Sequence, residues 1–279
     1  MATASATQVK AANPLKEYLG AIIMLACILV GILLYVFVMG NPENFVGNDP
    51  KNHQKEGNLL GLVYKGGFLV PIAVAMLLMV VSFSIERLIS LGRASGKGSM
   101  DVFVHRIQLH LETNNLAQAL QECDAQRGTV GNVVKAAISK YQEMSEEHKS
   151  KGGTHTDKEQ RVIAIQKALE EATALELPML QKYLVIISTI VSVATLVGLI
   201  GTVLGMIRAF SALATSGAPD AVALANGISE ALINTALGIS TSTIATVIYN
   251  YFTARIDEMT YRIDEAGFSI VQTFAEKHA

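Results

Sequence analysis

Charged residues are scarce in this chain of 279 residues. Asp, Glu, Lys and Arg make up 16% of the sequence, whereas 51% of it is hydrophobic. Soluble domains usually carry roughly 25% charged residues, so the composition favours a membrane protein. The formal net charge of −2 gives no indication of nucleic-acid binding.

Residues that build disulfide scaffolds or metal sites are also few. Cys27 lies in an apolar run and Cys123 in a charged region, so both are expected to be free thiols. His105 and His110 are five residues apart and do not share a helical face, whereas zinc sites need three or four convergent ligands. No phosphate-binding motif is present either. We therefore expect no enzyme, no cofactor and no metal site.

Long stretches without charge are the most prominent feature that is present. They cover residues 18–42, 66–85, 183–207 and 231–254. A membrane-spanning helix needs about 20 such residues. The first stretch is longer than the core of a signal peptide, and no small-x-small cleavage site follows it. We predict an all-α protein with four transmembrane helices, at residues 18–40, 66–86, 183–208 and 230–253.

The distribution of Lys and Arg predicts the orientation of these spans. Arg87 and Arg93 directly follow the second span, and Arg255 follows the fourth, whereas the loop 209–229 has no Lys or Arg. By the positive-inside rule, this loop is extracytoplasmic, and residues 87–182 and both termini are cytoplasmic. The lysines of loop 43–65 oppose this assignment, and the parity of the other three helices decides it.

The charged region 87–182 reads as a helical cytoplasmic domain between the second and third spans. Apolar residues recur at helical spacing on both sides of the Asn114-Asn115 pair. A helix that starts near Asp157 is expected to run towards the third span, with a possible kink at Pro178. It would project that span well beyond the bilayer. Residues 254–279 are expected to form a cytoplasmic tail.

Hydroxyl side chains in the last two spans are not scattered. At 100° per residue, an arc of about 80° on the third span holds four of them: Ser188, Ser192, Thr195 and Thr202. Small residues at 198, 201 and 205 make close helix contacts available nearby. On the fourth span, Thr235, Ser242 and Thr246 share one face, and Glu230, Asn234 and Thr241 share another about 120° away.

Two interpretations of these polar faces are open. Ser and Thr in membrane bundles often form hydrogen bonds with neighbouring helices or with their own backbone. Two facing rows of hydroxyls with one intramembrane glutamate instead favour a polar lumen for a small cation. Because these side chains would lose polar contacts in lipid, the second interpretation predicts a ring-forming oligomer.

Three segments resemble the proton-channel family of ExbB, TolQ and MotA, most strongly ExbB. They are residues 198–210 (GLIGTVLGMIRAF), 227–239 (GISEALINTALGI) and 247–252 (VIYNYF). The end of the second span, residues 84–92, is similar to the end of the first ExbB helix. The resemblance covers roughly residues 60–275. It divides the chain into an additional N-terminal helix with its loop, residues 1–58, and a channel domain, residues 59–279.

The resemblance implies a function and a set of partners. Family members form a pentamer around a dimer of a single-span protein, ExbD or TolR, which carries an aspartate. They lie in the bacterial inner membrane and couple proton entry to work in the cell envelope, in the ExbB case through a TonB-like protein. The resemblance makes Thr202 and Thr235 pore-facing threonines and Glu230 the glutamate of the last span.

Departures from the family pattern leave alternatives open. Thr195 stands where the family commonly has proline, and the N-terminal span is additional to the three of a simple ExbB. MotA has four spans but tends to carry Thr-x-Tyr-Gly, where this chain has Thr-Ala-Leu-Gly at residues 235–238. A TolQ-type envelope motor and a MotA-type flagellar stator remain as alternatives to the ExbB role.

The last two spans have no titratable group near their middle. Glu230 lies near the extracytoplasmic end, and threonine hydroxyls donate and accept hydrogen bonds but do not hold an excess proton near neutral pH. A proton relay across about 30 Å of hydrocarbon therefore needs a carboxylate from another chain. This expectation agrees with the aspartate of the family's single-span partner.

Overall fold

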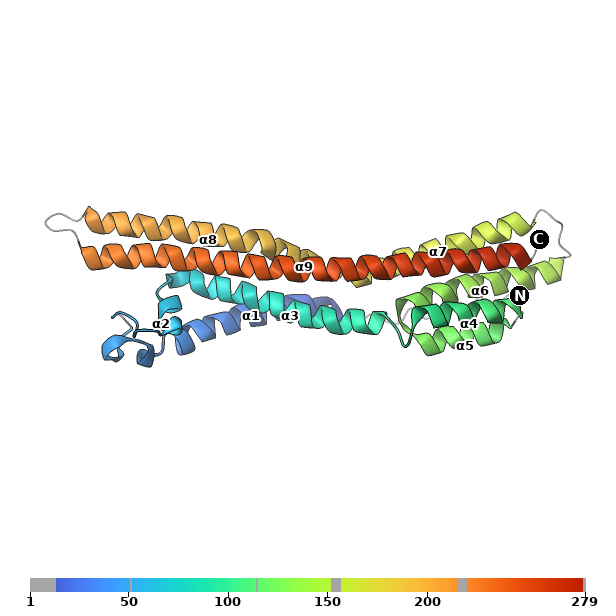
Figure 1. The fold of residues 1–279 in the computed structure, drawn as a ribbon, viewed down its shortest axis with the longest axis horizontal. Helices are drawn as coiled ribbons and strands as arrows, with labels where there is room; N and C mark the ends of the chain where they lie inside the picture. The colour runs from blue at the N-terminus through green and yellow to red at the C-terminus, as the bar shows by residue number, and fades with distance from the viewer. Residues whose placement is uncertain (1–13, 51, 114, 152–156, 215–219, 278–279) are drawn as a thin grey trace. The chain divides into compact units, whose positions relative to one another are not determined.

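The computed structural model describes residues 14–50, 52–113, 115–151, 157–214 and 220–277 (Figure 1). Among them no β-strand is present, and an isolated bridge joins Phe45 and Gln54. The chain forms two compact units, each built from separate segments. Unit 1 comprises the chain up to Phe83 with Ile186–Val247, and unit 2 comprises Ser84–Val185 with the chain from Ile248 onwards. The all-α prediction is confirmed.

Four helices are long and apolar enough to cross a membrane. They are Tyr18–Met39, Gly67–Ala94, Leu184–Leu213 and Ala221–Ala275. The first combines α1 (Pro14–Leu33) with a π-helical end, η1 (Leu34–Met39), and the second combines η4 (Gly67–Leu69) with α3 (Val70–Ala94). The others lie in α8 (Leu184–Leu213) and α9 (Ala221–Lys277). The four predicted spans are confirmed as helices of sufficient length and apolarity.

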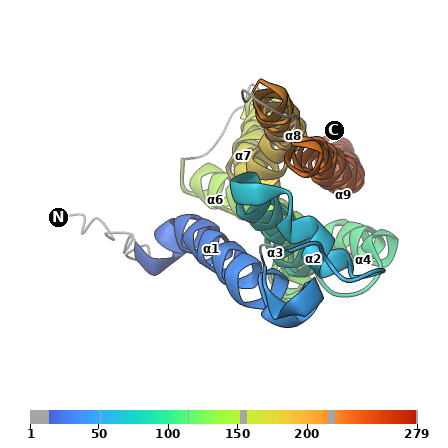
Figure 2. The same ribbon diagram turned by 90° about the vertical axis from the view of Figure 1, so that its left-hand side faces the viewer.

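In unit 1, α8 and α9 pack closely because small residues face each other. A Cβ atom on Gly205 would lie 2.6 Å from the backbone nitrogen of Ala231, and one on Gly227 would lie 2.6 Å from that of Ala209. A Cβ atom on Gly238 would lie 2.8 Å from the Cα atom of Gly198. Figure 2 shows the two helices side by side. Small residues allow such close backbone approach in membrane bundles, and the predicted small-residue contacts are confirmed.

The other side of unit 1 holds α1 and the segment that follows it. A Cβ atom on Gly31 of α1 would lie 2.9 Å from the carbonyl oxygen of Pro71, so α1 packs directly on α3. The following segment contains η2 (Pro42–Asn44), η3 (Val46–Asn48) and α2 (Leu59–Tyr64). Asn44 donates to the carbonyls of Val38 (2.8 Å) and Met39 (3.0 Å), which closes the end of the first span.

Unit 2 is a helical domain with one apolar core. It contains α4 (Met100–Glu112), α5 (Leu116–Gln126), α6 (Gly128–Lys151) and α7 (Asp157–Gln181). The core includes Phe103, Ile107, Ile138 and Ile165, all nearly inaccessible to solvent. The predicted helical region is confirmed. Asn114, at the predicted break, lies outside the described residues, and α4 and α5 end and begin on either side of it.

The predicted cytoplasmic tail is part of this core. The continuous helix α9 reaches Lys277, and Ile263, Ala266, Ile270 and Phe274 are buried in the same cluster as α4–α7. The ring of Phe274 stacks on Tyr141 at 4.1 Å between centroids. These apolar residues recur every three or four positions, a spacing that could have predicted their burial.

The helix predicted from Asp157 towards the third span is confirmed as α7, but it is not continuous with that span and so does not extend it beyond the bilayer. Pro178 lies inside α7, but the helix ends at Gln181, and α8 begins at Leu184. Between them, Tyr183 adopts a left-handed backbone conformation with φ of 66°, which commonly ends a helix. The helix that continues beyond its apolar span is therefore α9 and not α8.

A buried arginine binds the end of α7 at this break. The guanidinium of Arg87, which is 1% exposed, donates to the carbonyls of Met179 and Leu180, both at 3.1 Å. These are carbonyls of the last turn of α7, which otherwise lack partners within the helix. Glu86 accepts two further hydrogen bonds from the same guanidinium. Arg87 thus satisfies the end of α7 and holds it against the end of α3.

Candidate ion pathway

The polar faces of α8 and α9 differ in accessibility within unit 1. On α8, Ser192 and Thr195 are exposed, and Ser188 and Thr202 are half-buried. On α9, the first face is half-buried and consists of Thr235, Ser242 and Thr246. The second face is buried and consists of Glu230, Asn234 and Thr241. The first face of α9 therefore remains partly open at the surface of the protomer, and the second does not.

The two threonines singled out in the sequence contact each other. The hydroxyls of Thr202 and Thr235 form a hydrogen bond between α8 and α9. Each hydroxyl also lies near a backbone carbonyl of its own helix, that of Gly198 for Thr202 (3.3 Å) and that of Ala231 for Thr235 (3.1 Å). Because Gly198 has no side chain, the helices approach closely enough for this pair to form.

Thr202 also borders an open groove. The groove has a volume of about 650 Å³ and is lined by Val203, Met206, Ile207 and Phe210 of α8, among others. Its walls are largely apolar, and Thr202 and Ser211 contribute hydroxyl groups to them. A second helix with an apolar surface could therefore approach the Thr202–Thr235 pair from outside the protomer.

Two other hydroxyls of the first face of α9 make contacts within the bundle. Ser242 donates to the carbonyl of Val191 on α8 at 2.6 Å, and Thr246 donates to the carbonyl of Ser242 at 2.8 Å. These bonds join α9 to α8 or stay within α9, which is the structural role common for hydroxyls in bundles. A pore-lining role for Ser242 and Thr246 stays a prediction, as it does for Ser188, Ser192 and Thr195.

Glu230 has a partner that was not predicted from the sequence. Its carboxylate forms an ion pair with Arg208. Arg208 lies in α8 before the loop that joins the two helices, and Glu230 lies in α9 after it. The Glu230 side chain is 11% exposed and that of Arg208 is 52% exposed. The Arg208 guanidinium also lies 5.9 Å from the centre of the Phe68 ring. Arg208 ends one apolar stretch and Glu230 begins the next, so antiparallel packing of the two helices could have indicated this pair.

The backbone around Gly67 fits closely against this ion pair. Gly67 has φ of +77°, and a Cβ atom there would lie 2.5 Å from Oε1 of Glu230. Only glycine adopts this conformation readily and leaves room for the carboxylate. Next to it, Asn234 donates to the carbonyl of Gly66 at 2.8 Å. Glu230 and Asn234, on the buried face of α9, therefore contact the backbone at the start of the second span.

Among the described residues, no group of three or more His, Cys, Asp or Glu side chains is placed to hold a metal ion. On the buried face of α9, Glu230 is held by its ion pair with Arg208 and Asn234 by its hydrogen bond to the Gly66 carbonyl. The arrangement supplies hydroxyl donors and acceptors on an accessible face, and a neutralised carboxylate near one end of the span.

Comparison with known families matches residues 125–265, half of the chain, to the MotA/TolQ/ExbB proton channel family. The chain belongs to this family. The match includes α8, with Thr202 and Arg208, and the part of α9 with Glu230 and Thr235. Together with the four apolar helices, membership identifies a multi-pass membrane protein of a proton-channel family, which is not a family of enzymes.

Individual relatives carry both ExbB and TolQ names. The chain is 43% identical over 84 residues to the putative biopolymer transport protein ExbB-like 3 of Synechocystis sp., covering 29% of this chain and 40% of that protein. It is 26% identical over 209 residues to a putative ExbB homolog of Methanothermobacter thermautotrophicus, covering 75% and 67%. It is 28% identical over 162 residues to TolQ of Pseudomonas aeruginosa, covering 58% and 67%. The chain thus spans 40% to 67% of the length of these relatives.

Proposed function

We propose that the chain is the ring-forming, proton-conducting subunit of an ExbB–ExbD–TonB-type complex that uses proton motive force to drive transport across the outer membrane. The observation that carries this proposal is the hydrogen bond between Thr202 and Thr235, of which Thr202 lines an open groove. The pair lies in spans that have no Asp, Glu, Lys or Arg near their middle. The hydroxyls can position a titrating group but cannot replace it.

That titrating group comes from a partner chain. An ExbD- or TolR-like protein with a single span places an aspartate beside Thr202 and Thr235, where the two hydroxyls can donate to its ionised form or accept from its protonated form. Protonation removes the negative charge and changes how the partner helix docks against the polar wall. A TonB-like protein transmits the resulting movement.

The exposed hydroxyls of α8 support the proposal that several copies of the chain form a ring. Ser192 and Thr195 lie at the protomer surface on the same side of α8 as Thr202, and exposure of such a row to lipid would cost polar contacts. Several copies of the chain around a lumen remove this cost, and the family resemblance gives five copies. Native mass spectrometry of the detergent-purified protein should therefore find a pentamer, and a stable monomer would contradict the lumen.

The proposal also assigns a membrane and an orientation. The chain lies in the bacterial inner membrane with both termini and unit 2 in the cytoplasm, because Lys and Arg cluster on that side of three spans. Residues 59–279 form the channel domain, and residues 1–58 add a span that packs through Gly31 on α3. The contact of this added span with α3 is compatible with a place at the periphery of the ring.

A TolQ-type role in envelope maintenance is the second candidate. It is favoured by the alignment with TolQ of P. aeruginosa, which covers 67% of that protein. A MotA-type stator is a third and less favoured alternative, because the Thr-Ala-Leu-Gly sequence of α9 departs from the MotA pattern. Co-purification distinguishes the three: a TonB-like protein supports the first, a TolR-like protein without TonB the second, and a peptidoglycan-binding partner the third.

Proton flux into proteoliposomes tests the proposed function. The chain should conduct protons when it is reconstituted with its single-span partner, and flux should fall to background without that partner. The matched control is the same partner with its transmembrane aspartate changed to asparagine, which keeps its size but does not titrate. Flux by the chain alone, equal to that of the complex, would contradict the requirement for a second chain.

A further inference from the structure

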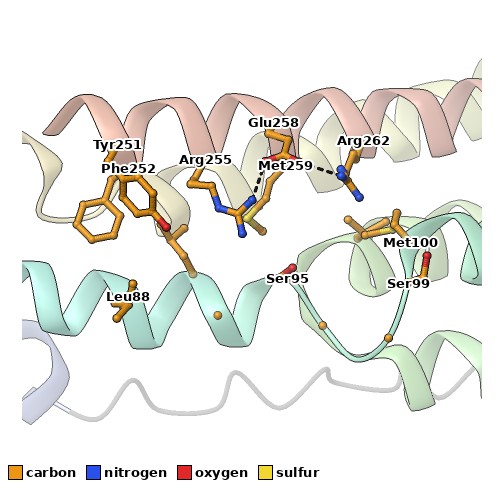
Figure 3. Close-up of a pocket in the computed structure, with 15 residues that line it drawn as sticks. Leu88, Ser95, Ser99, Met100, Tyr251, Phe252, Arg255, Glu258, Met259 and Arg262 are labelled. Carbon is orange, nitrogen blue, oxygen red and sulfur yellow. Dashed lines mark hydrogen bonds and ion pairs between the residues drawn. The ribbon is translucent and has the colours of Figure 1, made fainter. Parts of the chain in front are cut away.

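A second cavity lies entirely within unit 2, apart from the polar faces of the spans. It has a volume of about 440 Å³ and is enclosed by the end of α3, the connection to α4, and residues 251–262 of α9 (Figure 3). None of the residues proposed for the ion pathway lines it.

The two ends of this cavity differ in chemistry. Leu88 of α3 and Tyr251 and Phe252 of α9 lie at one end, as Figure 3 shows, whereas Arg262 and Ser99 lie at the other, with Arg255 between them. Tyr251 and Phe252 lie in the last residues of the uncharged stretch 231–254, and Leu88 lies three residues after the uncharged stretch 66–85. The cavity is therefore amphipathic, and its polar end is formed by α9 and by the connection between α3 and α4.

Positive charge predominates at the polar end. Glu258 accepts from Arg255 at 2.7 Å and from Arg262 at 2.8 Å, so two guanidiniums share one carboxylate. One positive charge is left over, and each guanidinium has five N–H donors, of which the carboxylate occupies only some. The hydroxyls of Ser95 and Ser99 line the same cavity and add further donors. Such a set suits a phosphate group, which guanidinium binds through paired hydrogen bonds.

We propose that this cavity binds an anionic phospholipid, with the headgroup phosphate at Arg255 and Arg262 and the lipid's apolar part against Leu88, Tyr251 and Phe252. Basic residues just beyond a span meet the anionic headgroups of the cytoplasmic leaflet, where the proposed orientation puts unit 2. An acidic peptide would use the arginines but would leave the apolar end without an occupant. The site is independent of whether the spans conduct protons.

Lipid retention tests the charge requirement. The full chain is purified in detergent, exchanged into an equimolar mixture of phosphatidylglycerol and phosphatidylcholine, and analysed by native mass spectrometry. The wild type should retain phosphatidylglycerol about fivefold over phosphatidylcholine, the ratio expected for one net charge at the membrane surface. The Arg255→Gln/Arg262→Gln variant should lose this preference. Arg106→Gln, which removes an exposed arginine from the same unit outside the cavity, should keep it.

A steric variant tests the cavity with its charges intact. Gly92 lines the cavity, and a Cβ atom there would meet no other atom within 4 Å. Gly92→Leu should therefore fold, fill the space and abolish retention of phosphatidylglycerol, whereas Gly92→Ala should retain it. Circular dichroism and the oligomeric state check that both variants are folded and assembled.

Three results would overturn the proposal. The first is an unchanged phosphatidylglycerol preference in both the double-arginine and Gly92→Leu variants. The second is displacement of the lipid by inorganic phosphate at equal concentration, which would identify a site for free phosphate. The third is equal retention of the two lipids by the wild type; binding of an acidic peptide in that case would identify a protein-binding site.

Discussion

Between Ala221 and Val247, α9 buries Glu230, Asn234 and Thr241 and exposes apolar side chains such as Leu232 and Val247. From Ile248 onwards the same helix buries Ile263, Ile270 and Phe274 and exposes the ion pairs of Glu258. In water, burial of apolar surface drives packing. In lipid this driving force is absent, and small-residue contacts and polar bonds hold helices together. The part of α9 up to Val247 therefore packs as helices do in lipid, and the part that carries Ile263, Ile270 and Phe274 packs as helices do in water.

The largest effect is expected in the second part of α9. Ile270→Ala removes a fully buried side chain from the core of unit 2, which typically costs about 2–5 kcal/mol. Hydrogen-exchange mass spectrometry should show faster exchange in residues 254–277 and unchanged exchange in residues 221–247. Loss of protection along both parts would contradict the division of α9 between two separately stabilised units.

A smaller effect is expected from a methyl group in the helix seam of the first part. Gly205→Ala places a Cβ atom 2.6 Å from the backbone nitrogen of Ala231, and overpacking of this kind costs roughly 1–3 kcal/mol. Gly92→Ala is the matched control, because its Cβ atom meets open space and alanine favours a helix over glycine by about 1 kcal/mol. Thermal stability in detergent should fall for the first variant and not for the second. Equal stability of both would show that the seam is not tightly packed.

Removal of Arg208 and removal of Glu230, the two partners of the ion pair in the first part of α9, should reduce stability by different amounts. Arg208→Gln leaves the nearly buried Glu230 carboxylate without its partner, whereas Glu230→Gln leaves a half-exposed Arg208 that water can solvate. The first loss should be the greater, although below the roughly 3–5 kcal/mol of a fully buried pair. The Arg208→Gln/Glu230→Gln double variant should recover part of the stability that Arg208→Gln loses.

Melting temperatures of the two single variants and the double variant measure this coupling. Arg106→Gln, which breaks an exposed pair with Glu122 at 3.5 Å, should change stability by no more than about 1 kcal/mol. Purely additive losses in the double variant would show that Arg208 and Glu230 do not interact.

The smallest effect is expected from the buried thiol of Cys123 in unit 2. Burial, reinforced by the neighbouring Asp124 carboxylate, raises the pKa of Cys123 from 9.0 to about 12. The Cys123 thiol ionises near pH 9 in the unfolded chain but stays protonated at that pH in the folded chain. Its contribution to the stability of unit 2 should therefore be constant below pH 9, and stability should fall as the pH rises above 9. Cys123→Ala should flatten this alkaline decline in melting temperature. The same slope in both proteins would show that another group causes it.

The features that could be predicted from the sequence are those that depend on local pattern. The stretches without charged residues were sufficient to predict the four spans. The helical periodicity of 100° per residue separated the two polar faces of α9, of which the face with Glu230, Asn234 and Thr241 is buried. Family resemblance indicated Thr202 and Thr235 as pore-facing threonines, but not the hydrogen bond between them. Their role in a pathway, like that of the other hydroxyls, stays a prediction.

The features that could not be predicted depend on contacts between distant segments. The end of α7 before Tyr183 is bound by Arg87, more than ninety residues earlier, and this contact has no local signature. The pair of Arg208 and Glu230 requires knowledge of how two helices align. The cavity at Arg255 exists only once the end of α3 has been placed beside α9.

The central claim is that the Thr202–Thr235 pair serves ion transfer and does not merely join two helices. Thr202→Val and Thr235→Val keep the branched shape and delete the hydroxyl, so each should cost only about 0.6 kcal/mol of stability. Thr243→Val is the matched control, because Thr243 is exposed on α9 and bonded to its own Ile239 carbonyl. The measurement is proton flux per assembled complex in proteoliposomes that contain the single-span partner. Flux should fall to background in the first two variants and stay normal in the third; near-normal flux in both Thr202→Val and Thr235→Val would contradict the claim.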